Sequence, residues 1–358
     1  MAELFAWLTR AGRNGAFEQL ALDDGLVAIG WGVLGDLTGL DRPELTQHIQ
    51  ATYPDYGIGV LRNSTGQLWA FVNRIQIGDL VALPSKSRPM VAIGRVTGDY
   101  QYRADLPEGA QHTRAVKWIA KDVPRTAIGQ DLLYSLGSLL TVCRLARNDA
   151  AVRLDRLATD GVDPGQQVTD ERGVDATVSD SDVSADSYGI EDALSAPTQR
   201  DLERDARDAI NRRIAERFPA HGLSRLVEAI LRAQGMTTFV APDGKDGGID
   251  VLAGSGPLGM DSPRICVQVK FTKDASSAMV VRELEGVMGR IRADQALLVS
   301  WSGVTRDAEL EMRREFFRVR VWDADELFRQ LTAVYDKLPE EIQAELPLKR
   351  IWTIAGGE

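Results

Sequence analysis

Polar residues interrupt an apolar run in the second half of the chain. In "RICVQVKF", residues 264–271, strand alternation places Gln268 and Lys270 on one face and the large apolar side chains on the other. Asp250 begins the preceding run, "IDVLA", after two glycines, and a hairpin-like connection would bring it beside them. Carboxylate and amide oxygens suit a hard Mg²⁺ ion. A neighbouring lysine can orient a nucleophile and balance charge on a phosphate, so the pattern predicts metal-assisted chemistry.

Strands and helices alternate around these residues. The short β-like runs are at 237–241, 249–253, 264–271, 295–301 and 318–322. The helical patterns are at 198–218, 224–235, near 276–292, near 304–317 and from Asp323 onward. This alternation is typical of an α/β sheet with helices packed on its faces. Glu228 lies on the helix that precedes the first of these strands.

The first half of the chain has a different pattern. Its short strands are at 26–32, 78–85, 90–102 and 115–120, and its helices are near 43–52, 66–76 and 127–146. Turn-forming Gly-Asp and Pro-Ser pairs interrupt these strands, which predicts a compact, strongly bent sheet or a small β-barrel. The chain as a whole is therefore expected to be α+β, with an α/β second half.

An acidic segment separates the two halves. Residues 160–192 contain ten Asp or Glu and one Arg, so their charge is −9, while residues 1–159 carry +1 and residues 193–358 carry −2. With almost no large apolar side chains, this segment cannot offset the entropy of ordering. We expect domains at 1–157 and 196–358, joined by a flexible linker at 158–195. The net charge of −10 does not exclude DNA, because clustered Arg can neutralise phosphates locally.

Composition excludes several classes of protein. No apolar run approaches the roughly 20 residues needed to cross a bilayer. The N-terminus lacks the order of basic, apolar and small residues of a signal peptide. Two cysteines and three scattered histidines do not fit a disulfide scaffold, a cysteine-rich zinc site or a histidine-based metal site. We expect a cytoplasmic protein without a membrane partner.

The polar residues of the second half carry a family resemblance. The series Glu228, "DGGID" ending at Asp250, and "QVK" ending at Lys270 resembles the nuclease domain of Mrr-type restriction endonucleases, within the PD-(D/E)xK superfamily. The resemblance runs from about residue 223 to 331. It implies that Asp250 and Gln268 bind metal, that Lys270 is catalytic, and that Glu228 assists from its helix.

The first half resembles the PUA-like superfamily, especially its EVE and YTH branches. The segments that carry this likeness are "AIGWGVLGDL", "IGDLVALPSK", "VAIGRVTGDYQYR" and "HTRAVKWIAKDVPR". The resemblance implies an aromatic pocket that holds a modified base. The candidate pocket residues are Trp31, Tyr100, Tyr102 and Trp118. The candidate phosphate contacts are Lys86, Arg88, Arg103 and Arg114.

Together these patterns lead to one hypothesis and its alternatives. The hypothesis is a Mg²⁺-dependent, modification-dependent (type IV-like) restriction endonuclease of phage defence, which cuts both DNA strands as a homodimer. A DNA-repair nuclease and a defence DNase activated by a small nucleotide are alternatives, and RNA stays open as a substrate. A non-catalytic nucleic-acid-binding protein is the remaining alternative. The intact set of Asp250, Gln268 and Lys270 argues against it.

Overall fold

Two compact units make up the chain. The computed structural model describes residues 4–165, 201–241 and 248–351, and it divides into Met1–Asp205 and Ala206–Glu358. The predicted linker lies outside the described residues from 166 to 195. Within the described ranges, none of the helices has the length and apolar character that a membrane span requires.

Unit 1 is built on a six-stranded sheet in the order β2-β5-β4-β3-β1-β6. Most neighbouring strands are antiparallel, but β1 and β3 run parallel. The strands are β1 (Ala6–Thr9), β2 (Leu26–Ile29), β3 (Leu80–Pro84), β4 (Met90–Tyr102), β5 (His112–Pro124) and β6 (Val142–Arg144). Because this order has two ends, β2 and β6, the described strands form an open sheet. The predicted PUA-like barrel is therefore not confirmed.

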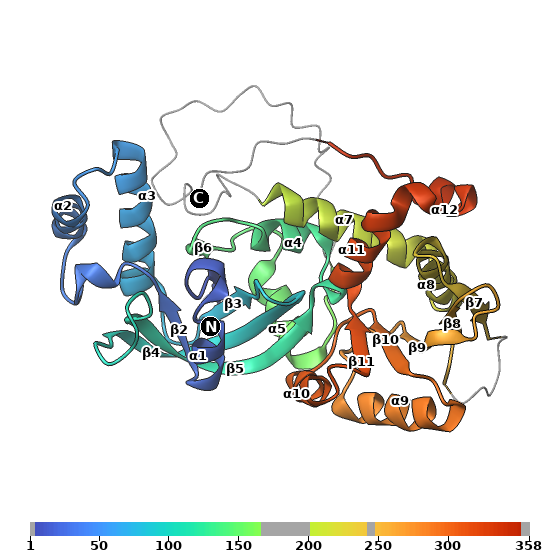
Figure 1. The fold of residues 1–358 in the computed structure, drawn as a ribbon. Helices are drawn as coiled ribbons and strands as arrows, with labels where there is room; N and C mark the ends of the chain where they lie inside the picture. The colour runs from blue at the N-terminus through green and yellow to red at the C-terminus, as the bar shows by residue number, and fades with distance from the viewer. Residues whose placement is uncertain (1–3, 166–200, 242–247, 352–358) are drawn as a thin grey trace. The chain divides into compact units, whose positions relative to one another are not determined.

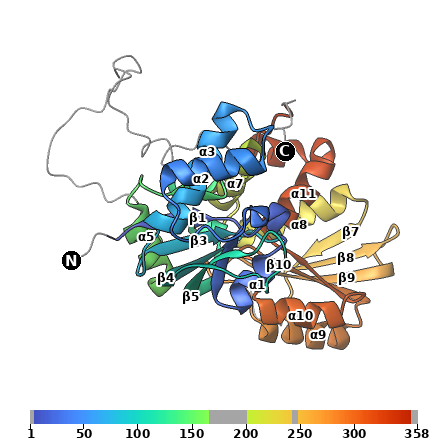
Figure 2. The same cartoon turned by 90° about the vertical axis from the view of Figure 1, so that its left-hand side faces the viewer.

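Helices cover both faces of this sheet (Figures 1 and 2). They are α1 (Glu18–Asp23), α2 (Arg42–Thr52), α3 (Ile58–Trp69), α4 (Gln130–Leu136) and α5 (Ala150–Asp160), with a π-helix, η3 (Ala70–Arg74), directly after α3. Side chains alternate along β3, so successive residues point to opposite faces of the sheet. Val81 packs with α2, α3 and η3, whereas its neighbours Leu80 and Ala82 pack with α4 and α5.

The predicted helix near 127–146 is shorter in the structure. Helix α4 ends at Leu136, because the chain beyond it turns to pair β6 with β1. Strand β6 is an edge strand of three residues. The Oε1 atom of Gln67, on α3, accepts hydrogen bonds from the backbone N–H groups of Thr141 and Val142, at 2.7 and 3.0 Å. A side chain thus satisfies backbone donors where β6 begins.

A buried arginine joins α5 to the chain that follows it. Arg153 is 1% exposed and donates to the carboxylates of both Asp131 and Asp163. Asp163 also accepts from the backbone N–H groups of Gly129 and Gly165, at 2.8 and 2.9 Å. Residues 158–165, the first part of the predicted linker, therefore form the end of α5 and a turn that is bonded to unit 1.

Unit 2 is built on a five-stranded mixed sheet in the order β11-β10-β9-β8-β7. The strands are β7 (Thr237–Val240), β8 (Val251–Ser255), β9 (Asp261–Lys270), β10 (Gln295–Ser300) and β11 (Val319–Trp322). Strand β8 runs antiparallel to both of its neighbours, β7 and β9, whereas β9, β10 and β11 run parallel to one another. The helices are α7 (Leu202–Arg217), whose start lies in unit 1, α8 (His221–Ala233), α9 (Ala278–Ile291), α10 (Arg306–Arg314), α11 (Ala324–Val334) and α12 (Glu340–Glu345).

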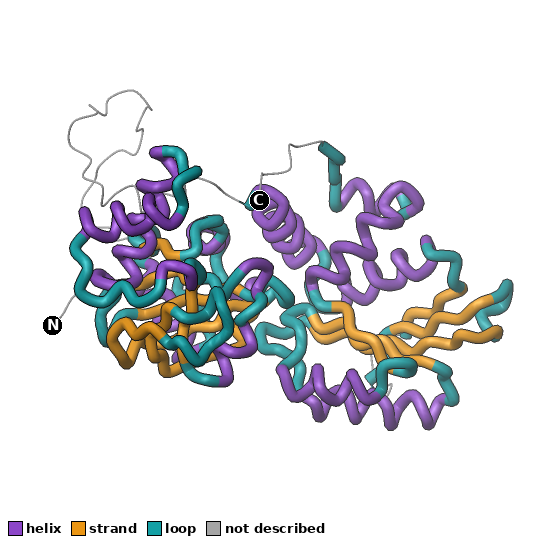
Figure 3. The backbone as a smooth tube through the Cα atoms, turned by 60° about the vertical axis from the view of Figure 1, so that its left-hand side comes forward, coloured by secondary structure: helices purple, strands orange, loops and turns teal. Residues whose placement is uncertain are grey.

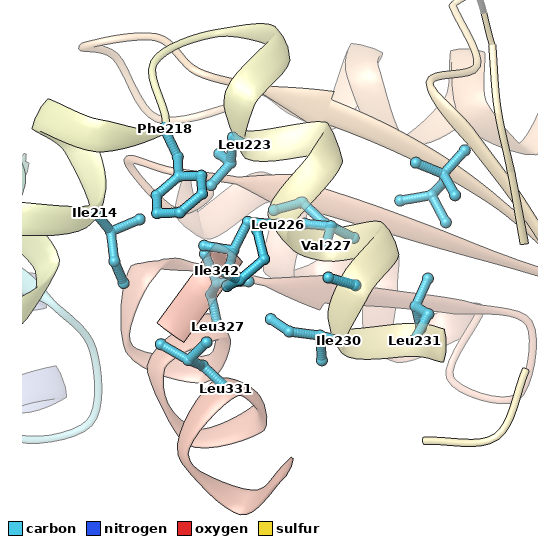
Figure 4. Packing of buried hydrophobic residues seen from close by; sticks show 14 of the residues in the cluster. Ile214, Phe218, Leu223, Leu226, Val227, Ile230, Leu231, Leu327, Leu331 and Ile342 are labelled. Atoms are coloured by element: carbon cyan, nitrogen blue, oxygen red, sulfur yellow. The ribbon is translucent and has the colours of Figure 1, made fainter. Parts of the chain in front are cut away.

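The sheet of unit 2 lies between two helical layers (Figure 3). On one face, Val267 packs with apolar residues of α7, α8, α11 and α12; Figure 4 shows the helical part of this core. On the other face, Cys266 packs with α9 and α10. Both neighbours on β9 are fully buried, and the burial of the Val267 side chain contributes roughly 1.5–3 kcal/mol. The predicted α/β architecture of the second half is confirmed.

Candidate active site

Antiparallel pairing of β8 with β9 brings Asp250 to Gln268. Val251 is paired with Val267, and Gln268 is the next residue of β9. The backbone N–H of Asp250 donates to the Val267 carbonyl at 2.9 Å. The Asp250 carboxylate accepts, through Oδ2, a 2.7 Å hydrogen bond from the Val269 N–H. The carboxylate is therefore anchored to the strand that carries the other candidate residues.

The environment of Asp250 favours a nearby positive charge. Burial raises the pKa of Asp250, because a desolvated carboxylate is less stable when charged. The hydrogen bond from Val269 and the charges of Lys270 and His221 act in the opposite direction. A cation beside this carboxylate would relieve the cost of its burial.

Gln268 supplies a buried oxygen without a partner. Its side chain is 9% exposed, and its Oε1 atom makes no hydrogen bond within the described part of the chain. Such a group costs about 1–3 kcal/mol unless something binds it. Gly248 lies against the same amide: it has a φ of 85°, and a Cβ added there would lie 2.8 Å from Gln268 Nε2. A larger residue at this position would displace the amide.

Lys270 ends β9 on the same face as Gln268. Its carbonyl accepts from the Trp301 N–H at 2.9 Å, and it is paired with Ser300 of β10. Ser300 is fully buried, its hydroxyl donates to the Gly303 carbonyl at 2.6 Å, and the Ser276 hydroxyl lies 2.8 Å away. The hydrogen bonds of these two serines connect the turns that follow β9 and β10. Neither serine was among the predicted site residues.

None of the described contacts joins Glu228 to Asp250, Gln268 or Lys270. Helix α8 packs on the face of the sheet that carries Val267, opposite the face of Gln268. The Glu228 carboxylate accepts from the Thr238 hydroxyl at 2.5 Å and pairs with Arg232. In the structure these contacts hold Glu228 toward β7.

The oxygen donors at this end of the sheet fit a hard metal ion in type. Asp250 offers a carboxylate and Gln268 offers an amide oxygen without a partner, which is the donor chemistry that Mg²⁺ prefers. Within the residues that the structure describes, no cluster of three or more His, Cys, Asp or Glu side chains could hold a metal ion. A metal here would depend on the amide oxygen and on water.

In unit 1, three of the four candidate aromatic residues meet at His112. Trp31 is a half-buried residue with a φ of 68°, a conformation that a bulky residue rarely adopts. Its carbonyl lies 3.0 Å from His112 Nε2, and the Tyr100 hydroxyl lies 2.8 Å from His112 Nδ1. Since a carbonyl only accepts, Nε2 carries the proton and Nδ1 accepts from Tyr100. The Tyr102 and His112 rings are 5.4 Å apart.

Trp118 and Arg114 have other roles in the structure. Trp118 donates through its indole N–H to the Ala21 carbonyl at 2.9 Å, six residues from His112 along β5 or roughly 20 Å. Arg114 is 3% exposed and donates to the carbonyls of Phe71 and Val72, in η3. Its guanidinium is thus buried among backbone acceptors, so the expected phosphate contact from Arg114 is wrong.

Acidification is expected to destabilise unit 1 through His112. Burial lowers the pKa of His112 from its ordinary value of 6.5, although the Trp31 carbonyl and Asp36 oppose the shift. The unfolded chain therefore binds the proton first, so the stabilisation is complete above pH 6.5 and is lost as pH falls through the lower folded pKa. Thermal midpoints measured at about pH 7.5 and about pH 5.5 should fall further for the natural protein than for His112→Gln. An equal fall in both proteins would contradict this role.

Known protein families match both units. Residues 7–143 match a model described as a domain of unknown function (DUF8426). Residues 215–331 match the Mrr catalytic model, described as a restriction endonuclease. No curated protein matches the chain at a significant level.

Two solved structures are similar to the chain over most of its length. One is the MspJI restriction endonuclease in complex with a 27-mer oligonucleotide, at 12% identity and a TM-score of 0.31, covering 95% of this chain and 79% of that one. The other is AspBHI, described as a DNA modification-dependent restriction endonuclease, at 16% identity and a TM-score of 0.30, covering 82% and 74%. The family match identifies residues 215–331, in unit 2, as a restriction endonuclease domain of the Mrr type.

Proposed function

We propose that the protein is a modification-dependent endonuclease, which recognises a modified base in DNA and hydrolyses phosphodiester bonds nearby. The observation that carries the nuclease part is the bond of the Asp250 carboxylate to Val269, which places it beside Gln268 and Lys270 on β9, within a restriction endonuclease domain. The partner is DNA. Cleavage of both strands would take two such domains, which a homodimer supplies.

The proposed catalytic residues act through position and charge. Asp250 and Gln268 would hold a Mg²⁺ ion, which when bound supplies Lewis acidity toward a phosphate oxygen and lowers the pKa of a bound water. Lys270 lies on the same face of β9, and its ammonium group makes no hydrogen bond or ion pair within the described residues. It is therefore available to stabilise the negative charge that develops on the phosphate. Glu228 is proposed only as a supporting residue on α8.

Unit 1 is proposed to read the base. Support comes from Trp31, which keeps a left-handed backbone conformation while His112 binds its carbonyl. Strained conformations of this kind persist where the surrounding structure fixes them, and they concentrate at ligand sites. Tyr100 and Tyr102 contribute rings on the same side of the β4–β5 hairpin. A flipped base stacked on such rings would gain about 1–3 kcal/mol.

Plasmid cleavage tests this function. Plasmids carrying modified cytosine or adenine and an unmodified plasmid are incubated with the protein, with Mg²⁺ or with EDTA. The expected result is cleavage of a modified plasmid in Mg²⁺ alone. Equal cutting of every plasmid would remove the base-reading role and leave the nuclease. Failure to cut any DNA with Mg²⁺ or other divalent ions would remove the catalytic role.

The Trp31→Ala variant tests the base reader separately. Loss of stacking should reduce the preference for modified over unmodified duplex by roughly 5-fold to 150-fold in Kd. Binding to phosphates should survive, so weak, salt-sensitive affinity for any duplex is expected to remain. Trp118→Phe is the matched control, because its indole bonds to Ala21 instead of joining the aromatic cluster. Unchanged discrimination in Trp31→Ala would rule out this ring as the reader.

A further inference from the structure

Unit 2 contains a small cavity at the edge of its sheet, away from the proposed cleavage site. Its volume is about 220 Å³. Walls come from the end of α8, the middle of β9, the start of β10, the turn after α10, and the edge strand β11. Its lining combines apolar side chains such as Ile265 with the aromatic residues Phe316, Phe317 and Trp322 and with Arg318 and Arg320.

Two adjacent phenylalanines line this cavity with their rings exposed to solvent. Phe316 is 52% exposed and Phe317 is 85% exposed, and their ring centroids lie 5.2 Å apart in a T-shaped arrangement. Neither ring belongs to the cores of unit 2. Exposed large aromatic groups beside a concavity mark a binding surface more often than isolated exposed apolar residues do.

The arginines give the cavity a positive rim. The Arg320 guanidinium lies 3.7 Å from the centroid of the Phe316 ring and donates to the Phe316 carbonyl, which fixes this ring against β11. Arg318 is paired with Glu315 at 3.3 Å, but its side chain is 56% exposed. An exposed pair of this kind contributes little to stability, so Arg318 can exchange its partner for an incoming anion at low cost.

We propose that this cavity binds one unstacked nucleotide. Aromatic faces bind a nucleobase by stacking, and arginine is the side chain best suited to bind a phosphate. The volume suits a single ring system and is below the roughly 300–1,000 Å³ of sites for drug-sized ligands. The base packs against Phe317 and Trp322, and the phosphate lies beside Arg318 and Arg320.

This nucleotide is not the one that is cut. Ile265, in the wall of the cavity, lies five residues before Lys270 on the same strand, which is a span of roughly 16 Å. The occupant is either a base extruded from bound DNA or a free nucleotide, since the cavity chemistry is the same for both. It defines a second nucleotide site in the nuclease domain.

The experiment measures binding to the full chain carrying Lys270→Ala, in EDTA, so that no DNA is consumed. Deoxyadenosine monophosphate is titrated by calorimetry, and a short fluorescent single-stranded oligonucleotide by anisotropy. Phe317→Ala is expected to weaken binding of one or both probes by roughly 5-fold to 150-fold. Phe239→Ala is the matched control, because Phe239 is a 59% exposed phenylalanine on β7, outside the cavity. It should leave both dissociation constants unchanged.

The two probes separate the sources of the nucleotide. Tight binding of the monophosphate identifies a free-nucleotide site, whereas an effect on the oligonucleotide alone identifies an extruded base. The proposal is overturned if neither probe binds, or if Phe317→Ala and Phe239→Ala behave alike. It is also overturned if light scattering shows that Phe317→Ala changes only the oligomeric state, because the aromatic pair would then join two copies of the chain. Each of these failures leaves the plasmid assay unaffected.

Discussion

Replacing Lys270 with alanine is expected to reduce Mg²⁺-dependent DNA cleavage by at least about 100-fold, the typical effect of removing one group that stabilises transition-state charge. Lys270 ends β9, and its side chain is only partly buried, so the fold should persist. Initial rates on a modified plasmid at saturating Mg²⁺ measure the loss. Asp250→Asn should cause a comparable loss, because it removes the charge while keeping an oxygen that can accept from the Val269 N–H.

A neighbouring lysine provides the control. Lys273 lies three residues beyond Lys270 in the exposed turn after β9. Lys273→Ala removes the same charge from the same region but not from the face of Gln268, so it should retain most of the activity. Full cutting by Lys270→Ala, with unchanged folding by circular dichroism, would remove Lys270 from the mechanism.

Replacing Arg153 with methionine is expected to destabilise unit 1 by about 3–5 kcal/mol, because two carboxylates would lose the buried cation that they share. Burial alone would raise the pKa of Asp163, but its bonds from Arg153 and two backbone N–H groups outweigh that and lower it. Hydrogen bonds from Arg153 lower the pKa of Asp131 as well. The thermal midpoint of unit 1 should fall by roughly 6–20 °C, as measured by calorimetry at neutral pH.

Another arginine on the same helix separates this effect from a general loss of charge. Arg156 pairs with Asp160 one turn later, but both side chains are more than half exposed. Arg156→Met should change the free energy of unfolding by less than about 0.5 kcal/mol. A midpoint for Arg153→Met as high as that of Arg156→Met would show that the buried network contributes no net stability.

The α/β half of the fold could be predicted because its central strands, β9 and β10, carry apolar residues that are buried on both faces, and because its helices are periodic. The alternation around Gln268 placed it and Lys270 on one face, as the structure has them. The position of Asp250 beside this strand has a different origin. It depends on the register of β8 with β9, which the turn between them and an irregularity before Ser255 determine. Residue types alone do not specify that register.

Unit 1 was harder to predict because its contacts are long-range. The aromatic residues were visible as candidates, but His112 was seen only as one of three scattered histidines. Its importance arises from the pairing of β5 with β4, which sets it opposite Tyr102. The predicted phosphate contact of Arg114 was wrong for the same reason, because the carbonyls that bind its guanidinium belong to η3, more than 40 residues earlier in the sequence. A sequence pattern at β5 carries no information about that helix.

The short edge strand β6 also bears on the behaviour of the protein at high concentration. An edge strand with unpaired donors is a template for another chain, and long edges of this kind lead to aggregation. Here Gln67 occupies the N–H groups of Thr141 and Val142, and the strand extends for only three residues. An incoming strand would have to displace an amide that belongs to a packed helix. At Val142, the sheet of unit 1 is thereby closed to strand addition.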